Sequence, residues 1–217
     1  MASADAMHAQ QEAARFLMEE KGANYFFTLK GNQPSIQEKA QRLLEGAFPP
    51  VDLAQAETVE KHHGRVETRQ IWALGVTAEQ MGFYGAEQVA RIRRHFAHLK
   101  SGKQSDETVF AITGLGRLPD ERANGEMLLG IARGHWSIEN GNHYVRDRSY
   151  DEDRCQVREP NSAHILATLR SMALFLAKKH AHNPSNARQA TTPALNRFCA
   201  AHRNRAIHWL MSERGLR

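Results

Sequence analysis

Acidic side chains are concentrated in one short stretch of the sequence, where their neighbours suit anion chemistry. Residues 133–154 read RGHWSIENGNHYVRDRSYDEDR and place Glu139 and four further acids among arginines, histidines, a tryptophan and a tyrosine. Mg²⁺ prefers one or two carboxylates together with water and phosphate oxygens. One interpretation of the stretch is therefore a carboxylate that helps to hold a divalent metal ion.

The spacing around Glu139 is compatible with two interpretations. On a helix, at about 100° per residue, Glu139 shares one stripe with His135, Asn142 and Arg146. Cations one turn away would keep the carboxylate charged, as a metal ligand requires. The same pattern is typical of a solvated face stabilised by ion pairs between successive turns. The sequence leaves both interpretations open.

Other candidate residues also have ordinary structural explanations. Asp151, Glu152 and Asp153 follow one another after the predicted helix, which is typical of a solvated loop or a cap. Asp5 precedes a predicted helix and is expected to cap it, but a strand ending at this point would place it where α/β folds carry their chemistry. Cys155 and Cys199 show no motif of a nucleophile or a zinc site, and we expect two small buried side chains.

Composition sets limits on the class of protein. The chain has 217 residues, 41% hydrophobic residues, two cysteines and a formal net charge of +5. Its length suits one large or two small domains, and the positive charge weakly favours a polyanionic partner. No apolar run is long enough for a membrane span or a signal peptide, so we expect a cytoplasmic protein that does not contact membranes.

Apolar periodicity predicts an α/β fold. A helix, a buried strand and a second helix capped by Ser35 are expected in the first 48 residues. Antiparallel strands are expected within 57–116, with a helix start mixed into 82–100. The remaining predicted helices are 119–147 capped by Asp120, 161–181 capped by Asn161 or Ser162, and a basic helix at 194–217. On the 161–181 helix, the expected buried face is Ile165, Leu166, Leu169, Met172, Ala173 and Leu176.

Several blocks of the sequence together resemble a known family. ADAMHAQQEAARFLMEEKGANYFFTLKGNQPSIQEKA, HGRVETRQIW and RGHWSIENGNHYVRDRSYDEDRCQV are similar to bacterial insertion-sequence transposases of the ISAs type, which include the H-repeat-associated proteins. The resemblance continues through ILATLRSMALFLAKKH and LNRFCAAHRNRAIHWL. It runs collinearly through nearly the whole chain, and the combination of blocks is far more specific than any single one.

The resemblance implies a fold and a division of the chain. It implies an incomplete RNase H-like core with a β-rich insertion and C-terminal helices. Residues 1–56 are expected to form part of that core and 57–118 the insertion. Residues 119–181 are expected to carry the catalytic glutamate and close the core, and 182–217 to form a basic C-terminal helix.

The resemblance also implies metal-dependent cleavage and transfer of DNA strands. Members of the family use an Asp-Asp-Glu triad to hold two metal ions, Mg²⁺ or Mn²⁺. Carried over to this sequence, the second aspartate falls on Asp5 and the glutamate on Glu139. His135, Asn142 and Arg146 are expected to support the site, although the family usually has an apolar residue at position 142.

The implied partner is double-stranded DNA at the ends of an insertion sequence. Residues expected to contact its phosphates are Lys30, Arg91, Arg93, Arg94, Lys178, Lys179, Arg203 and Arg205. Residues 1–4, MASA, offer no counterpart of the family's first aspartate. We therefore expect a truncated and inactive copy, poorly soluble or self-associating, or a partner of a full-length transposase. A non-catalytic DNA-binding or regulatory fragment is the alternative.

Overall fold

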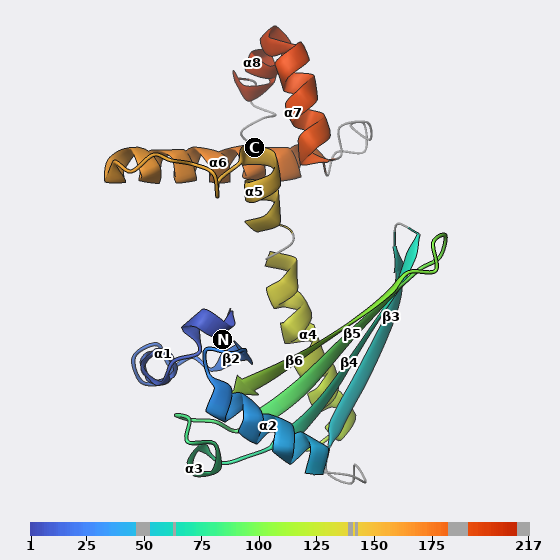
Figure 1. The fold of residues 1–217 in the computed structure, drawn as a ribbon. Helices are drawn as coiled ribbons and strands as arrows, with labels where there is room; N and C mark the ends of the chain where they lie inside the picture. Colours follow the sequence, from blue (N-terminus) through green and yellow to red (C-terminus); the bar gives the residue numbers. More distant parts are fainter. Residues whose placement is uncertain (47–52, 63, 139–140, 142, 182–190, 212–217) are drawn as a thin grey trace. The chain divides into compact units, whose positions relative to one another are not determined.

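The chain folds into two compact units, Met1–His135 and Trp136–Arg217. The computed structural model describes residues 1–46, 53–62, 64–138, 141, 143–181 and 191–211 (Figure 1). All six strands lie in the first unit, whereas the described part of the second unit is built from helices. None of the helices within these ranges combines the length and apolar character that crossing a membrane requires.

The first unit is built on one mixed sheet with the strand order β1-β2-β6-β5-β4-β3. Its strands are β1 Ala2–Ala4, β2 Tyr25–Leu29, β3 Ala54–His62, β4 Arg65–Gly75, β5 Gln88–His98 and β6 Gln104–Thr113. β1 is parallel to β2, and every other pair is antiparallel. The mixed α/β fold is thus confirmed, and the antiparallel strands expected within 57–116 extend the sheet that β1 and β2 begin.

One face of the sheet packs against the helices that flank β2. Tyr25, Phe27 and Leu29 alternate along β2 and point to this face, where they pack with Ile36 and Leu44 of α2 (Pro34–Gly46). The short helix α1 (Gln11–Arg15) adds its buried Ala14 to the same cluster. Alternate residues of a strand point to opposite faces, so β2, which is buried along its whole length, needs a second cover on its other side.

The opposite face is covered by α4 (Glu121–Ile138). Asp120 accepts a 2.8 Å hydrogen bond from the Ala123 N–H, which confirms the predicted cap. Asn124 is completely buried and donates a 2.7 Å hydrogen bond to Gln88 of β5. Leu128 and Leu129 are buried one turn further on. The first half of α4 is therefore fixed on the sheet by both apolar and polar contacts.

Gly125 permits the closest approach between α4 and the edge strand β3. A Cβ atom at this position would lie 2.6 Å from the Gln55 carbonyl carbon and 3.0 Å from the Ala56 nitrogen. We expect Gly125→Ala to lower the free energy of unfolding by about 1–3 kcal/mol, because backbone atoms cannot move aside as a side chain can. Denaturant midpoints of the variant and the parent chain measure the loss.

Gly130 of the same helix provides the matched control. A Cβ atom there would meet nothing within 4 Å. Gly130→Ala should gain up to about 1 kcal/mol through helix propensity alone. Equal effects of the two substitutions would contradict the role assigned to Gly125.

Two predictions about helix starts and one about a strand need correction. α2 begins at Pro34 and not after Ser35, and the Gln33 carbonyl accepts the first helical hydrogen bond from Gln37. α6 (Pro160–Ala181) begins before Asn161 and Ser162, and the Glu159 carboxylate caps the Ser162 N–H at 2.6 Å. Both prolines occupy the first helical position, where their fixed φ and missing N–H cost nothing. A helix start was expected within 82–100, but residues 88–98 form the strand β5. The nearest helix before this strand is the short α3 (Ala78–Met81).

The second unit also departs from the predicted pattern. On α6 the buried residues are Leu174 and Ala177, whereas Ile165, Leu169 and Met172 of the expected core face are more than half exposed. Because α6 is apolar on several sides, periodicity alone does not identify the side that α5 (Tyr144–Tyr150) and α7 (Thr192–Ala201) cover. The single basic helix expected at 194–217 is two helices, α7 and α8 (Arg203–Met211), separated at His202.

Candidate functional site

Asp5 lies directly after β1, at the end of the only parallel strand pair in the described sheet. Its Oδ1 accepts a 2.7 Å hydrogen bond from the Ala6 N–H, and Ala6 opens a short 3₁₀ turn, η1 (Ala6–His8). The two readings that the sequence left open are both correct. Asp5 caps a helical turn, and it also stands at the carboxyl end of a strand.

Two residues of β2 and its following loop orient the Asp5 carboxylate. The Thr28 hydroxyl donates to Asp5 Oδ1 at 3.0 Å, and Lys30 Nζ lies 3.2 Å from the same oxygen. In the part of the chain that the structure describes, every polar contact of this carboxylate falls on Oδ1. Because the Asp5 side chain is 52% exposed, Oδ2 remains accessible to a ligand.

The loop after β2 holds the turn after β1 in place. The Asn32 side-chain amide donates to the Ala6 carbonyl, and that of Gln33 donates to the Ala9 carbonyl at 2.8 Å. The blocks ADAMHAQ and LKGNQP of the sequence therefore contact each other at one end of the parallel pair. Thr28, Asn32 and Gln33 were not predicted as site residues, although the LKGNQP block itself was the available signal.

The surroundings of Asp5 keep its carboxylate ionised. The Ala6 N–H holds the pKa of Asp5 below its ordinary value of 3.8, and Lys30 and Thr28 act in the same direction against partial burial. A depressed folded-state pKa stabilises the protein above the unfolded pKa, and this contribution is lost as pH falls through the folded value. The interaction is thus fully present at neutral pH.

We expect Lys30→Met to move the pKa of Asp5 upward toward 3.8. The substitution removes the Lys30 ammonium group, which donates to the Asp5 carboxylate and stabilises its negative charge. Titration of the ¹³C-labelled Asp5 carboxyl group by NMR between pH 2 and 6 measures the change. Lys21→Met is the control, since Lys21 lies over the Phe16 ring and makes no ion pair with a described acid. An unchanged Asp5 midpoint in Lys30→Met would contradict the ion pair.

The remaining predicted acid lies outside the described residues. Glu139 and Asn142, which lie in the sequence between the end of α4 and the start of α5, are both outside the described residues. No group of three or more His, Cys, Asp or Glu residues suited to a metal ion occurs within the described ranges. Asp5 offers a hard carboxylate oxygen of the kind that Mg²⁺ prefers.

The two predicted supporting residues that the structure describes belong to different units. His135 lies in the last turn of α4, at the end of the first unit. Arg146 lies in α5 and donates to Glu152 at 2.6 Å, and Arg170 of α6 approaches the same carboxylate at 3.8 Å. Arg146 therefore already has an acidic partner within the second unit.

The remaining acids and the cysteines of the second unit have local roles. Asp151 ends α5 in the left-handed region at φ 51°, so it acts as a C-terminal cap. Glu152 is paired with Arg146 and Arg170, so the interpretation of residues 151–153 as a solvated loop or cap holds only in part. Cys155 and Cys199 are half-buried rather than fully buried, and the Arg170 side chain holds the pKa of the Cys155 thiol below its usual range.

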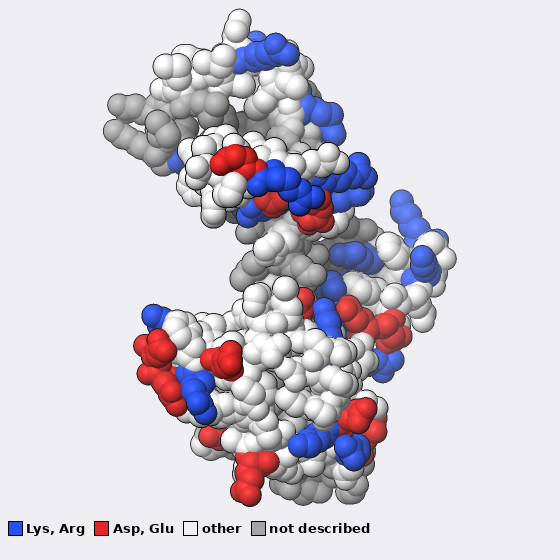
Figure 2. Space-filling model, turned by 60° about the vertical axis from the view of Figure 1, so that its left-hand side comes forward, with Lys and Arg blue, Asp and Glu red and all other residues white. Residues whose placement is uncertain are grey.

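The predicted phosphate-binding residues are spread over both units. Arg91 stacks on Trp72 at 4.5 Å, and Arg93 is paired with Asp106 at 2.8 Å. Arg94 points to the other face of β5 and is paired with Glu67. Lys178 and Lys179 lie near the end of α6, and Arg203 and Arg205 are exposed on α8. Figure 2 shows that basic side chains occur on several elements rather than in one field.

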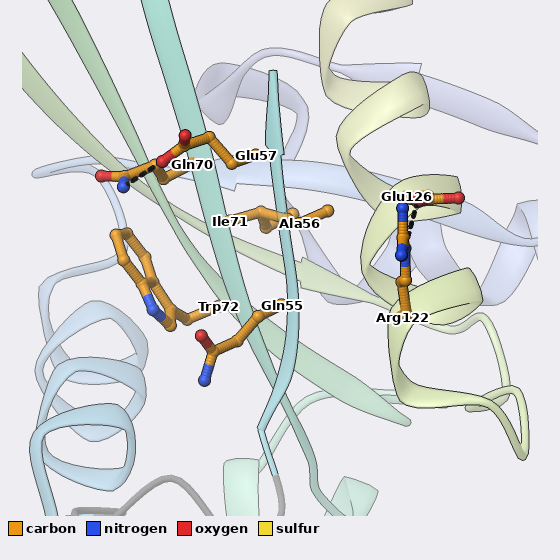
Figure 3. Close-up of a pocket in the computed structure, with 8 residues that line it drawn as sticks. All are labelled: Gln55, Ala56, Glu57, Gln70, Ile71, Trp72, Arg122 and Glu126. Carbon is orange, nitrogen blue, oxygen red and sulfur yellow. Dashed lines mark hydrogen bonds and ion pairs between the residues drawn. The ribbon is translucent and has the colours of Figure 1, made fainter. Parts of the chain in front are cut away.

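A cavity of about 310 Å³ lies at the opposite edge of the sheet from Asp5. It surrounds the edge strand β3 and includes Trp72 of β4 and Arg122 of α4 (Figure 3). Gln70 donates to Glu57 at 2.6 Å, and Arg122 donates to Glu126 at 2.9 Å, so these polar groups in its wall have partners. Asp5 is not among the residues that line this cavity.

Comparison with known proteins identifies one family. Residues 1–176 match the family described as Transposase DDE domain. The chain is 27% identical over 175 residues to "Putative transposase YncI" of Escherichia coli O157:H7, covering 80% of this chain and 44% of that protein. It is 28% identical over 182 residues to "H repeat-associated putative transposase YhhI" of E. coli strain K12, covering 78% of this chain and 45% of that protein.

A shorter match has higher identity. A Xanthobacter autotrophicus protein named "Uncharacterized protein in dhlA 3'region" is 41% identical over 70 residues, which are 32% of this chain and 23% of that protein. The chain thus spans less than half the length of these curated relatives.

Proposed function

The chain belongs to the Transposase DDE domain family, and from this premise we propose that it carries two acids of a metal-dependent site for DNA strand cleavage and transfer. Asp5 is the proposed second aspartate and Glu139 the proposed glutamate. The observation that carries this proposal is the geometry of Asp5. An ionised carboxylate stands at the carboxyl end of a parallel strand, with Oδ1 fixed by three contacts and Oδ2 accessible.

The sheet supports the proposal at the level of architecture. In α/β folds, ligands bind beyond the carboxyl ends of parallel strands, and Asp5 and Lys30 follow β1 and β2 at that end. We interpret β1 and β2 as part of an RNase H-like core, and β3 to β6 as the insertion that extends it. α4 then leads from the sheet toward Glu139.

Each residue has a distinct proposed role. Asp5 and Glu139 hold Mg²⁺ or Mn²⁺, and Thr28 and the Ala6 N–H keep the Asp5 carboxylate in one orientation. When bound, two such ions about 3.5–4 Å apart activate the attacking oxygen and stabilise the leaving oxygen of a phosphodiester. Lys30 neutralises Asp5 without metal and turns to a DNA phosphate when a metal ion replaces it. His135, Asn142 and Arg146 support Glu139.

The proposal extends to partners. Double-stranded DNA at insertion-sequence ends is the substrate, with Arg91, Lys178, Lys179, Arg203 and Arg205 among the residues that meet its phosphates. Self-association or pairing with a full-length transposase is part of the proposal, because Ile165, Leu169, Met172 and Phe175 expose apolar surface along α6. Alone, residues 1–217 are proposed to be inactive, because they offer two of the three acids.

A reconstitution experiment tests the function. The chain is mixed with Mn²⁺ and a labelled duplex carrying its own element's terminal repeat, with and without the N-terminal part of a full-length relative. We expect no cleavage by the chain alone and cleavage in the complemented mixture. Duplex binding without cleavage in either mixture would instead support the non-catalytic alternative.

A further inference from the structure

We propose that the free end of the sheet, formed by the tips of the β3–β4 and β5–β6 hairpins, binds the phosphate backbone of double-stranded DNA. This hairpin-tip surface is defined by Arg65, His98, Lys100 and Lys103. The inference rests on the proposed function and deepens it, because it assigns a surface to the DNA beyond the cleavage site.

Backbone hydrogen bonds hold the two tips side by side. Arg65 of β4 is directly opposite His98 of β5. The His98 N–H donates to the Lys103 carbonyl at 2.9 Å, and the Leu99 N–H donates to the Gly64 carbonyl of the other hairpin at 2.9 Å. The cations of two separate turns are thereby brought to one end of the sheet.

The charge at this end is not compensated locally. Residues 61–66 and 97–104 contain four lysines and arginines and no aspartate or glutamate. Among the described residues, Arg65, Lys100 and Lys103 make no ion pair, and Lys100 and Lys103 are exposed. Figure 2 shows blue side chains at the protruding end of the sheet.

The neighbouring acids are already occupied further along the strands. Glu67 is paired with Arg69 at 2.8 Å and with Arg94, and Asp106 is paired with Arg93 at 2.8 Å. The arginines closer to the core therefore have structural partners. Arg65, Lys100 and Lys103 have no acidic partner among the described residues, which is the charge pattern expected of a surface for a polyanion.

The Arg65 side chain is held in position before any ligand binds. Its guanidinium lies over the Phe96 ring at 5.3 Å, and Arg94 lies over the same ring at 4.4 Å. The Arg65 Nε atom is buried and lacks a hydrogen-bond partner. An arginine fixed on an aromatic ring loses less side-chain freedom when it binds a phosphate.

The hairpin-tip surface lies on the same face of the sheet as Thr28, in the direction in which β1 and β2 run. Thr28, which donates to Asp5, is opposite Ala111 of β6, and alternate residues from Ala111 to Lys103 point to the same face. β1 and β2 run toward the tips. Eight residues at about 3.4 Å each place the tips about 27 Å beyond the level of Asp5. B-form DNA rises about 3.4 Å per base pair, so a duplex at Asp5 would meet the tips about eight base pairs away.

The test is the salt dependence of duplex binding. Fluorescence anisotropy measures the Kd of a labelled 30-base-pair duplex for the full chain, without metal, over a range of NaCl concentrations. Lys100→Ala/Lys103→Ala should weaken binding about tenfold at low salt and reduce the slope of log K against log salt by about 1.8, which is two phosphate contacts. Lys100→Arg/Lys103→Arg should restore both values.

The matched control removes the same charge elsewhere. Lys21→Ala/Arg42→Ala alters helices on the other face and should leave the salt slope unchanged. A tip variant that binds like the parent chain would overturn the hairpin-tip surface while leaving the proposed function intact. A parent chain that binds no duplex at low salt would overturn both. Heparin binding without duplex binding would also overturn the inference.

Discussion

Asp5→Asn and Glu139→Gln should each reduce metal-dependent cleavage by about 10²–10³-fold in the complemented mixture. Each substitution keeps the size of the side chain and removes the negative charge that a divalent ion requires. Metal-ion stabilisation of the reacting oxygens is worth several kcal/mol, and about 1.36 kcal/mol corresponds to a factor of ten in rate. Single-turnover cleavage of the labelled terminal repeat in Mn²⁺ measures the effect.

Glu126→Gln provides the control for this prediction. Glu126 lies on α4 with its side chain 58% exposed and pairs with Arg122 at 2.9 Å, so its loss changes charge on the same helix without reaching the proposed site. Duplex binding without metal should be the same for all three variants. Full cleavage by Glu139→Gln would remove Glu139 from the proposed site.

The cap that Asp5 forms was predictable from sequence because its contact with the Ala6 N–H is local. A short polar residue before a helical turn is expected to cap that turn, and β2 was recognisable from its uninterrupted apolar run. The parallel pairing of β1 with β2 was less accessible, because β1 has only three residues. The sequence patterns did not identify the polar partners of this segment. Thr28 contacts Asp5, and Asn32 contacts Ala6, only after the strands pair.

The errors in the helices have a common cause. After Pro34 and Pro160, a serine or asparagine was predicted as the cap of the helix. Proline at the first helical position is equally compatible with these sequences. The competing signals differ by single residues, so sequence reasoning placed both starts one or two residues late.

β5 shows a different limit. Its residues QVARIRRHFAH contain three arginines, which favour helices as strongly as they favour exposed strands. The strand is stabilised by partners on both sides, with Arg94 paired to acids of β4 and β6. Such partners are set by strand register, and Glu67 lies 27 residues before Arg94, too far for a local sequence window to contain both.

Glu67→Ala should lower the free energy of unfolding by about 3–5 kcal/mol, the largest loss of stability expected in this chain. The Glu67 side chain is 7% exposed and is the shared acceptor of Arg69 at 2.8 Å and Arg94. The side chains of both arginines are less than one-fifth exposed. Breaking a buried pair typically costs about 3–5 kcal/mol. Each arginine keeps a second acid, Arg69 with Glu60 at 2.9 Å and Arg94 with Glu107 at 3.7 Å, so a loss at the lower end of this range is expected.

Glu107→Ala separates this cost from the general effect of losing an acid near Arg94. Glu107 is 53% exposed and lies 3.7 Å from Arg94, so its removal should change the stability by less than about 1 kcal/mol. Urea unfolding followed by circular dichroism compares the two variants, with Glu67→Gln expected between them because an amide oxygen still accepts from arginine. Equal midpoints for Glu67→Ala and Glu107→Ala would mean that water compensates the Arg69 and Arg94 charges, and that the network does not hold the extended strands in register.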